Sequence, residues 1–79
     1  MSEYADAFNE AVAAELRAQR GRQQITINEI VTTTGLSKSA VLNYMNGKRD
    51  IPVPALMDIC RALGISAGVI FDRAEQAIQ

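Results

Sequence analysis

The most constraining feature of this sequence is a series of short segments with helical apolar spacing, each bounded by residues that start or stop a helix. Ser37 and Ser66 can cap the first turn of a helix, and Gly35 and Gly64 can adopt the left-handed conformation in which many helices end. No stretch shows the strict apolar and polar alternation of a strand. The pattern therefore predicts an all-α fold.

We expect five helices from these signals. Thr26 and Glu29 have the spacing of a capping box, the pair Asn46-Gly47 suits a helix stop, and Pro54 suits the first turn of a helix. The expected helices, as residue numbers, are 2 or 3 to about 23, 27–34, 38–45, about 54–63 and about 67–77.

The length and composition fit one domain that covers residues 1–79. Apolar residues make up 48% of the chain and the net charge is −1, which is typical of a compact globular domain. The sequence has no histidine, one cysteine and no glycine-rich phosphate loop, which excludes the usual zinc-ligand sets and histidine-based nucleophiles. We therefore expect no enzyme activity, cofactor, metal or small-molecule substrate.

The single Cys60 lies within an apolar helical pattern, where a free thiol behaves as a small buried hydrophobe. No apolar run reaches the roughly 18 residues that a membrane span needs. The acidic start of the chain also lacks the basic and apolar regions of a signal peptide. These observations predict a cytoplasmic protein without a membrane partner.

The charges are distributed unevenly along the chain, although the sequence pI is only about 5.2. Residues 17–49 hold six cations and one acid, a net of +5, and the remaining residues sum to −6. A basic segment of this kind can meet nucleic-acid phosphates even in an acidic protein. Helix-dipole matching is the alternative explanation for Arg20 and Arg22, because arginines near a helix end are stabilising without any ligand.

Residues 27–46 have the spacing of a helix-turn-helix motif, which places its second helix in the major groove of duplex DNA. On that second helix, one side must pack against the first helix, and the other side faces outward. The inward side carries Leu36, Val41 and Tyr44. The outward side carries Lys38, Ser39, Leu42, Asn43 and Asn46.

The outward side offers residues suited to reading base edges. Lys38 can donate to guanine O6 and N7, Asn43 can pair with adenine N6 and N7, and Ser39 can do either weakly. Leu42 is expected either to contact a thymine methyl group or to pack at the edge of the core. Taken singly, Ser39 and Asn43 also fit an ordinary solvated face, and only the surrounding pattern favours base reading.

A second set of residues is predicted to bind phosphate oxygens beside the groove. Asn46, Lys48 and Arg49 follow the motif in a loop whose amides and cations can grip the DNA backbone, the alternative being a plain solvated turn. Arg20 and Arg22 could reach the same backbone from the other side. The full predicted phosphate-binding set is Arg20, Arg22, Thr26, Asn28, Ser37, Asn46, Lys48 and Arg49.

Residues from about Leu16 to Phe71 resemble the XRE family of helix-turn-helix regulators, which are related to the lambda Cro and repressor proteins. The resemblance rests on Thr26-Ile27-Asn28-Glu29-Ile30, on Gly35-Leu36-Ser37, and on the runs 39–49 and 59–66. It implies a five-helix lambda-repressor-like bundle. It also implies that bases are met at the positions of Lys38, Ser39 and Asn43, and phosphates at those of Asn46 and Lys48.

Three positions depart from the family's pattern. Ile27 stands where the family often has a glutamine that holds the phosphate backbone, so that contact is expected to be missing. Val31 replaces a usual alanine at the close approach of the two helices and is expected to shift their crossing slightly. Met45 stands where a glutamate commonly pairs with an arginine matching Arg20, which is expected to leave Arg20 freer to bind phosphate.

One recognition helix reads only a few base pairs, and regulators of this class commonly bind two half-sites as a symmetric dimer. We therefore expect a homodimer on a pseudo-palindromic operator. The candidate dimerisation helix spans residues 67–78, where the apolar repeat consists of Ile70, Ala74, Ala77 and Ile78. Alternatively, Ile70 and Phe71 close the core and residues 74–79 fray.

The expected function is sequence-specific binding of double-stranded DNA by a transcriptional regulator that acts by occupying its operator. Repression is the expected sign, and the resemblance suggests a phage or mobile-element regulator of the Cro/CI type. Two alternatives use the same fold: an antitoxin that neutralises a toxin through another surface, and a protein-interaction module that binds no DNA. Salt-dependent binding to duplex DNA separates the last alternative from the others.

Overall fold

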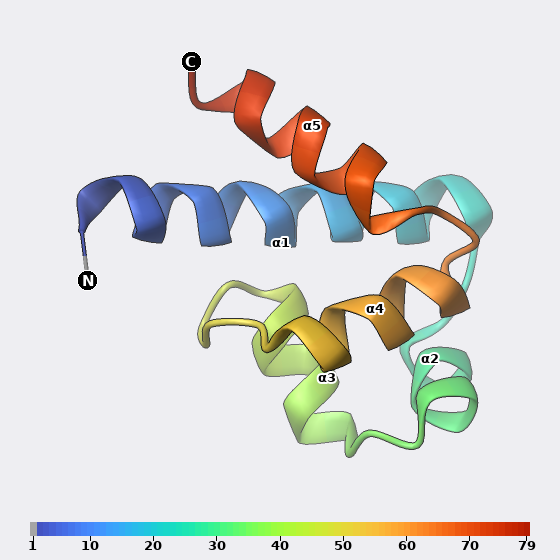
Figure 1. Ribbon diagram of the computed structural model, residues 1–79. Helices are drawn as coiled ribbons and strands as arrows, with labels where there is room; N and C mark the ends of the chain where they lie inside the picture. Colours follow the sequence, from blue (N-terminus) through green and yellow to red (C-terminus); the bar gives the residue numbers. More distant parts are fainter. Residues whose placement is uncertain (1) are drawn as a thin grey trace.

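The computed structural model describes residues 2–79, which form five α-helices and no strand (Figure 1). The predicted all-α class and number of helices are confirmed. The fourth helix begins one residue before Pro54, which lies in its first turn as expected. The helices are α1 (Glu3–Gln23), α2 (Ile27–Thr34), α3 (Lys38–Met45), α4 (Val53–Ala62) and α5 (Ala67–Ala77).

The longest helix, α1, runs across the molecule and lies between α5 and the other three helices (Figure 1). α5 packs on one side of it, and α2, α3 and α4 lie on the other side. All five helices contribute apolar side chains to one buried cluster, whose fully buried members include Leu16, Ile30, Val41, Ile59, Leu63 and Ile70. The helix-turn-helix segment is therefore anchored to α1 by a shared core.

Capping interactions determine where α2 and α3 begin and end. The Thr26 hydroxyl accepts a hydrogen bond from the Glu29 backbone N–H (3.1 Å), and the Glu29 carboxylate accepts one from the Thr26 backbone N–H (3.0 Å). These two bonds complete the predicted capping box. Gly35 ends α2 in the left-handed conformation with a φ of 75°, and the Ser37 hydroxyl caps α3.

Two core residues, Met45 and Gln19, were not expected from the sequence. The Met45 side chain is buried at the end of α3 within the apolar cluster. Gln19 is buried on α1, where its side-chain amide donates a hydrogen bond to the Leu63 carbonyl (3.3 Å). This bond satisfies a buried polar group and joins α1 to the end of α4.

α4 and α5 are core helices. Cys60 is buried in α4, as its apolar surroundings predicted, and burial raises the pKa of its thiol. Within residues 2–79, no helix alone has the length and apolar composition of a membrane span. α4 and α5 meet that requirement only as a pair, and the chain bends by 104° between them.

The dimer surface predicted on α5 is corrected in part by the burial of its residues. Ile70 and Ala74 have no exposed surface, because they pack into the same apolar cluster as Val12 and Leu16 of α1. α5 continues to Ala77, whereas the alternative expectation was that the chain frays from residue 74 onward. Ile70 and Ala74 are therefore core residues of one protomer and have no surface with which to contact a second copy.

Glu29 makes the capping box sensitive to pH. The hydrogen bond from the Thr26 backbone N–H is the main cause that holds the pKa of the Glu29 carboxyl below its ordinary value. Because the pKa of Glu29 is lower in the folded state, the stabilisation by its charged carboxylate is full above the unfolded-state pKa. This stabilisation is lost as the pH falls through the folded-state pKa.

We expect the variant Glu29→Gln to melt at a lower temperature than the unchanged protein at neutral pH, since a neutral amide is a weaker acceptor than a carboxylate. The difference should shrink as the pH is lowered through about 4 and below. Thermal unfolding followed by circular dichroism measures it, with Glu75→Gln, an exposed carboxylate on α5, as the control. A difference that stays constant over this pH range would contradict the assignment.

Candidate nucleic-acid interface

The turn between α2 and α3 is built from hydrogen bonds around Gly35 and Thr34. The Gly35 N–H donates to the Val31 carbonyl (2.9 Å). The Thr34 hydroxyl donates to the Ile30 carbonyl (2.8 Å) and accepts a hydrogen bond from the Leu36 N–H (3.2 Å). Thr34 thus ties the last turn of α2 to the start of the turn, a role that its sequence position did not reveal because threonine is common near helix ends.

α3 presents the two sides that its helical spacing predicted. Val41 is fully buried, and Leu36 and Tyr44 pack against the edge of the core. On the outward side, Lys38, Ser39 and Asn46 are exposed, whereas Leu42 and Asn43 are half-buried. The base-reading candidates therefore share one side of α3, with the more exposed pair at its first turn.

The loop after α3 folds back on the helix through its backbone. The Lys48 N–H donates to the Asn43 carbonyl (2.9 Å), and the Gly47 N–H donates to the Tyr44 carbonyl (3.2 Å). Gly47 has a φ of 72°, and a Cβ atom at this position would collide with the carboxylate of Glu10 on α1. The left-handed backbone conformation therefore requires glycine here, whereas the exposed Glu10 side chain could move aside.

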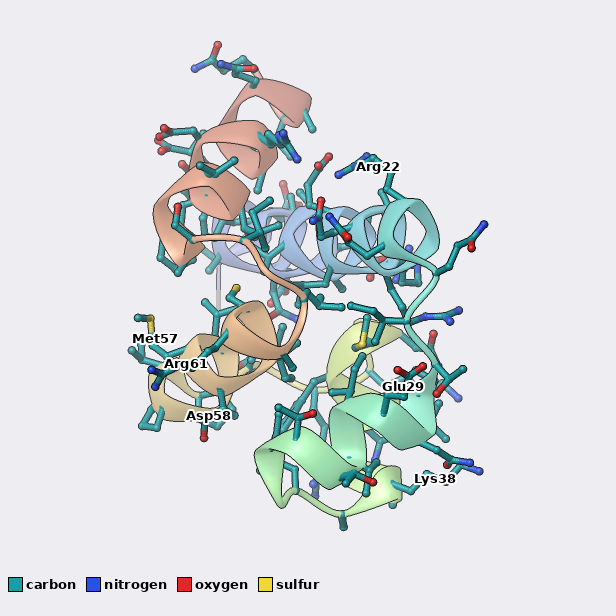
Figure 2. The ribbon with its side chains drawn as sticks, turned by 90° about the vertical axis from the view of Figure 1, so that its right-hand side faces the viewer. Arg22, Glu29, Lys38, Met57, Asp58 and Arg61 are labelled. Atoms are coloured by element: carbon teal, nitrogen blue, oxygen red, sulfur yellow. The ribbon has the colours of Figure 1, made fainter. Side chains whose placement is uncertain are left out.

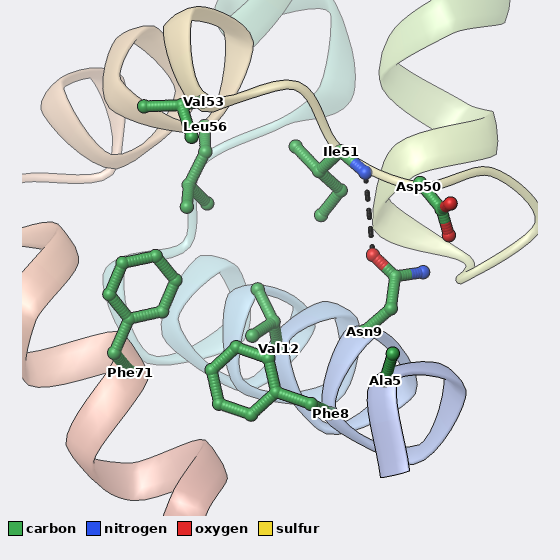
Figure 3. A pocket seen from close by; sticks show the side chains of 9 residues that line it. All are labelled: Ala5, Phe8, Asn9, Val12, Asp50, Ile51, Val53, Leu56 and Phe71. Atoms are coloured by element: carbon green, nitrogen blue, oxygen red, sulfur yellow. Dashed lines mark hydrogen bonds between the residues drawn. The ribbon is translucent and has the colours of Figure 1, made fainter. Parts of the chain in front are cut away.

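The side chain of Asn9 on α1 holds the same loop from the other side. Its Nδ2 donates to the Arg49 carbonyl (3.2 Å), and its Oδ1 accepts a hydrogen bond from the Ile51 N–H (3.3 Å), the latter drawn in Figure 3. One amide thus bridges two backbone groups of the loop that carries Lys48 and Arg49. The sequence did not reveal this clamp, because its partners lie 40 and 42 positions away.

Arg17 supports the end of α3. Its Nη1 donates a hydrogen bond to the Met45 carbonyl (2.7 Å), where a cation also opposes the negative end of the helix dipole. Its Nη2 lies 3.8 Å from the Glu10 carboxylate, but an exposed ion pair of this kind contributes little. The hydrogen bond to the backbone is therefore the more important contact of Arg17.

Arg20 and Arg22 donate hydrogen bonds to groups only five and three residues away in the sequence. Arg20 Nη1 donates to the Ile25 carbonyl (3.1 Å), so Met45 does not leave this arginine free as expected. Arg22 donates through Nε and Nη2 to the side-chain oxygen of Gln19 (3.3 and 3.1 Å). Figure 2 shows Arg22 far from Lys38, so the structure does not bring Arg22 together with the outward side of α3.

The other predicted phosphate-binding residues lie at the first turns of α2 and α3. Thr26, Asn28 and Ser37 are exposed there. The Thr26 and Ser37 hydroxyls accept capping hydrogen bonds, and each keeps its own proton to donate. Helix N-termini also favour anions through their backbone N–H groups. The structure thus leaves these three side chains accessible to a phosphate.

Ile27 and Val31, which depart from the family pattern on α2, both pack half-buried against the core. Neither side chain offers a hydrogen bond to DNA. The missing glutamine contact at Ile27 remains a prediction.

The side chains gathered around α3 supply hydrogen-bond donors and positive charge. Lys38 lies at the start of the helix, and Lys48 and Arg49 lie in the loop beyond its end, all three exposed. Between them stand Ser39 and Asn43, whose polar groups match base edges. Within residues 2–79, no three His, Cys, Asp or Glu side chains gather into a group that could hold a metal ion.

Replacing Asn9 with alanine should loosen the loop after α3 and leave the domain folded. The Ile51 N–H would lose its partner, and one hydrogen bond contributes about 1 kcal/mol, or roughly fivefold in an opening equilibrium. We expect the Ile51 amide to exchange with solvent about five times faster, measured by NMR. The control Asn28→Ala, at an exposed position on α2, should leave this rate unchanged, and equal rates in Asn9→Ala and the unchanged protein would disprove the clamp.

Residues 11–70 match the family profile described as a helix-turn-helix domain. The matched segment is most of the chain and contains α2, α3 and α4 entirely. The chain is also 37% identical over 46 residues to the HTH-type transcriptional repressor RghR of Bacillus subtilis. The aligned residues are 58% of this chain and 34% of RghR, so the match spans about a third of that relative.

Two crystal structures of the clp gene regulator ClgR from Corynebacterium glutamicum have a similar fold. Each superposes with a TM-score of 0.83 at 24% sequence identity. The superpositions cover 91% and 90% of this chain and 94% and 76% of the two ClgR chains. At this identity the likeness concerns the fold, and it confirms the helix-turn-helix architecture predicted from the spacing of residues 27–46.

Proposed function

This chain belongs to the helix-turn-helix domain family, and from that premise we propose that it is a transcriptional regulator that reads a specific duplex sequence with α3. The observation that carries the proposal is the outward side of α3, where Lys38, Ser39 and Asn43 are followed by the cations Lys48 and Arg49. Base-edge donors flanked by phosphate-binding groups are the combination that sequence-specific recognition requires.

Three side chains are assigned to bases. Lys38 is exposed at the first turn of α3 and suits the O6 and N7 acceptors of guanine. Asn43 is half-buried, which restricts its rotamers and favours a defined pair with adenine N6 and N7. Ser39 lies one turn before Asn43 and can donate or accept. Leu42, also half-buried, is assigned contact with a thymine methyl group.

The phosphate contacts are assigned to both sides of the groove. Lys48, Arg49 and Asn46 approach one strand from the loop that Asn9 holds. The exposed first turns of α2 and α3 approach the other strand, with backbone N–H groups and the hydroxyls of Thr26 and Ser37. Arg22 is left out of this set, because its side chain lies far from Lys38.

The proposed mode of action is occupancy of a pseudo-palindromic operator by two copies of the chain. Each α3 reads one half-site, and the bound pair excludes polymerase, as a repressor of the Cro/CI type would. RghR, a repressor by name, supports this sign of regulation. A regulator of this kind works in the compartment that holds the DNA, which we propose is the cytoplasm.

Replacing Asn43 with alanine should weaken binding to the preferred duplex by about 1–3 kcal/mol and relax the preference at one base pair. Selection of bound duplexes from a random pool, followed by titration of the winners, measures both effects. Gln76→Ala, at an exposed position on α5, is the control and should select the same sequences as the unchanged protein. Unaltered selectivity in Asn43→Ala would show that this residue does not read a base.

Replacing Lys48 with alanine should weaken binding to all sequences alike. Loss of one phosphate contact should reduce the slope of log K against log salt concentration by about 0.9. Arg61→Ala is the matched control, since it removes the same charge from α4 at a place that Figure 2 shows away from Lys38. If Lys48→Ala and Arg61→Ala gave the same slope as the unchanged protein, Lys48 would not contact phosphate.

A further inference from the structure

An apolar hollow of about 320 Å³ opens between α1, α4 and α5, beside the loop that follows α3 (Figure 3). Asn9 and Asp50 lie at one end of it. Its apolar walls are the side chains of Phe8, Val12, Val53, Leu56 and Phe71, and we call it the α1–α4–α5 hollow. Val53 on its rim is 66% exposed, so the hollow presents apolar surface to water.

Tyr4 stands next to this hollow. Its ring stacks on Phe8 with the centroids 6.5 Å apart and an angle of 15° between the planes, and Phe8 in turn meets Phe71 at 5.7 Å. Tyr4 itself is 64% exposed. A projecting aromatic side chain and an apolar hollow thus lie beside each other, one helical turn apart on α1.

We propose that the α1–α4–α5 hollow receives Tyr4 from a second copy of this chain, and that a two-fold axis makes the insertion mutual. A two-fold interface uses the same patch on both copies, so that patch must be complementary to itself. A projecting side chain beside a hollow meets this requirement, because the Tyr4 of each copy can enter the hollow of the other. The inference rests on the proposed function, which places two copies on one operator.

The chemistry of the hollow matches a tyrosine. Phe8 and Phe71 form aromatic walls for the ring, and aromatic pairs are favourable beyond the area that they bury. The exposed carboxylate of Asp50 can accept a hydrogen bond from the phenol hydroxyl at the end of the hollow.

The position of the hollow also suits two copies on DNA. Asp50 and Ile51, which line it, directly follow Lys48 and Arg49 in the loop assigned to phosphate. The copy-to-copy contact would therefore continue from the DNA contact.

The size of the contact predicts a weak dimer. A tyrosine buries about 150–250 Å², so two inserted rings and the walls that cover them bury roughly 600–1,000 Å² in total. Stable complexes bury about 1,200–2,000 Å². We therefore expect copies that exchange rapidly in solution and associate firmly only when DNA holds both.

Sedimentation equilibrium of the full chain without DNA, at up to about 1 mM protein, tests the interface by itself. The unchanged protein should form dimers in this range, and Tyr4→Ala and Val53→Lys should stay monomeric. Both altered side chains are largely exposed, and circular dichroism confirms that the variants fold. Val69→Lys is the matched control, because Val69 is 39% exposed on α5 and does not line the hollow.

Tyr4→Phe refines the test, since it keeps the ring and removes the hydroxyl that Asp50 would accept. We expect its dimer to be weaker by about tenfold. An unchanged protein that stays monomeric to about 1 mM, or Tyr4→Ala and Val53→Lys variants that dimerise like it, would overturn the proposal.

Disulfide trapping tests the direction of the insertion. A mixture of the single variants Tyr4→Cys and Val53→Cys should form the mixed disulfide in preference to either symmetric one, because each Tyr4 would lie in the hollow of the other copy. The unchanged protein, whose only thiol is the buried Cys60, should form none. A dominant Tyr4→Cys homodisulfide would overturn mutual insertion.

Binding to DNA separates this inference from the proposed function. Val53→Lys should bind a single half-site with the salt slope of the unchanged protein and lose cooperativity on paired half-sites. Full cooperativity in Val53→Lys would overturn the interface. If the unchanged protein bound no duplex at all, the proposed function would fail, and the sedimentation result would still decide whether the hollow receives Tyr4.

Discussion

The apolar cluster that joins α1 to the end of α3 is the interaction on which the rest of the structure depends. Leu16, Val41 and Met45 are buried within it. Truncation of one such side chain costs about 2–5 kcal/mol, whereas a whole domain is stable by only about 5–15 kcal/mol. The hydrogen bonds from Asn9 to the loop after α3 and from Arg17 to the last residue of α3 form only because this packing brings α1 and α3 together.

The local part of the fold was predictable from the sequence. Thr26, Ser37 and Ser66 accept hydrogen bonds from backbone groups three residues away, so the helix starts depend on information within one turn. The two sides of α3 follow from its period of 3.6 residues in the same way. These features place the helix-turn-helix segment and its outward side before any tertiary contact is known.

The contacts that join distant segments were not predictable. Asn9 is an unremarkable polar residue on a helix until the loop at residues 49–51 packs against it. Ile70 and Ala74 show the same helical spacing whether they face the core or a partner, and only the packing of α5 on α1 decides between the two. Arg20 has a side chain long enough to reach either a phosphate or the Ile25 carbonyl, and the path of the chain after α1 determines which.

The acidity of the whole chain and the basic character of its recognition surface are compatible because charge acts over a limited distance. At physiological salt the screening length is about 8 Å, which is less than the shortest extent of the molecule, 18 Å. A phosphate near Lys48 and Arg49 therefore responds to these cations and to the neighbouring carboxylates of Glu10 and Asp50, whereas the acids on α5 are largely screened from it. The same acids repel DNA that approaches from their own side. The uneven distribution of charge thus favours one docking orientation over others, which a uniformly basic protein of the same fold would not do.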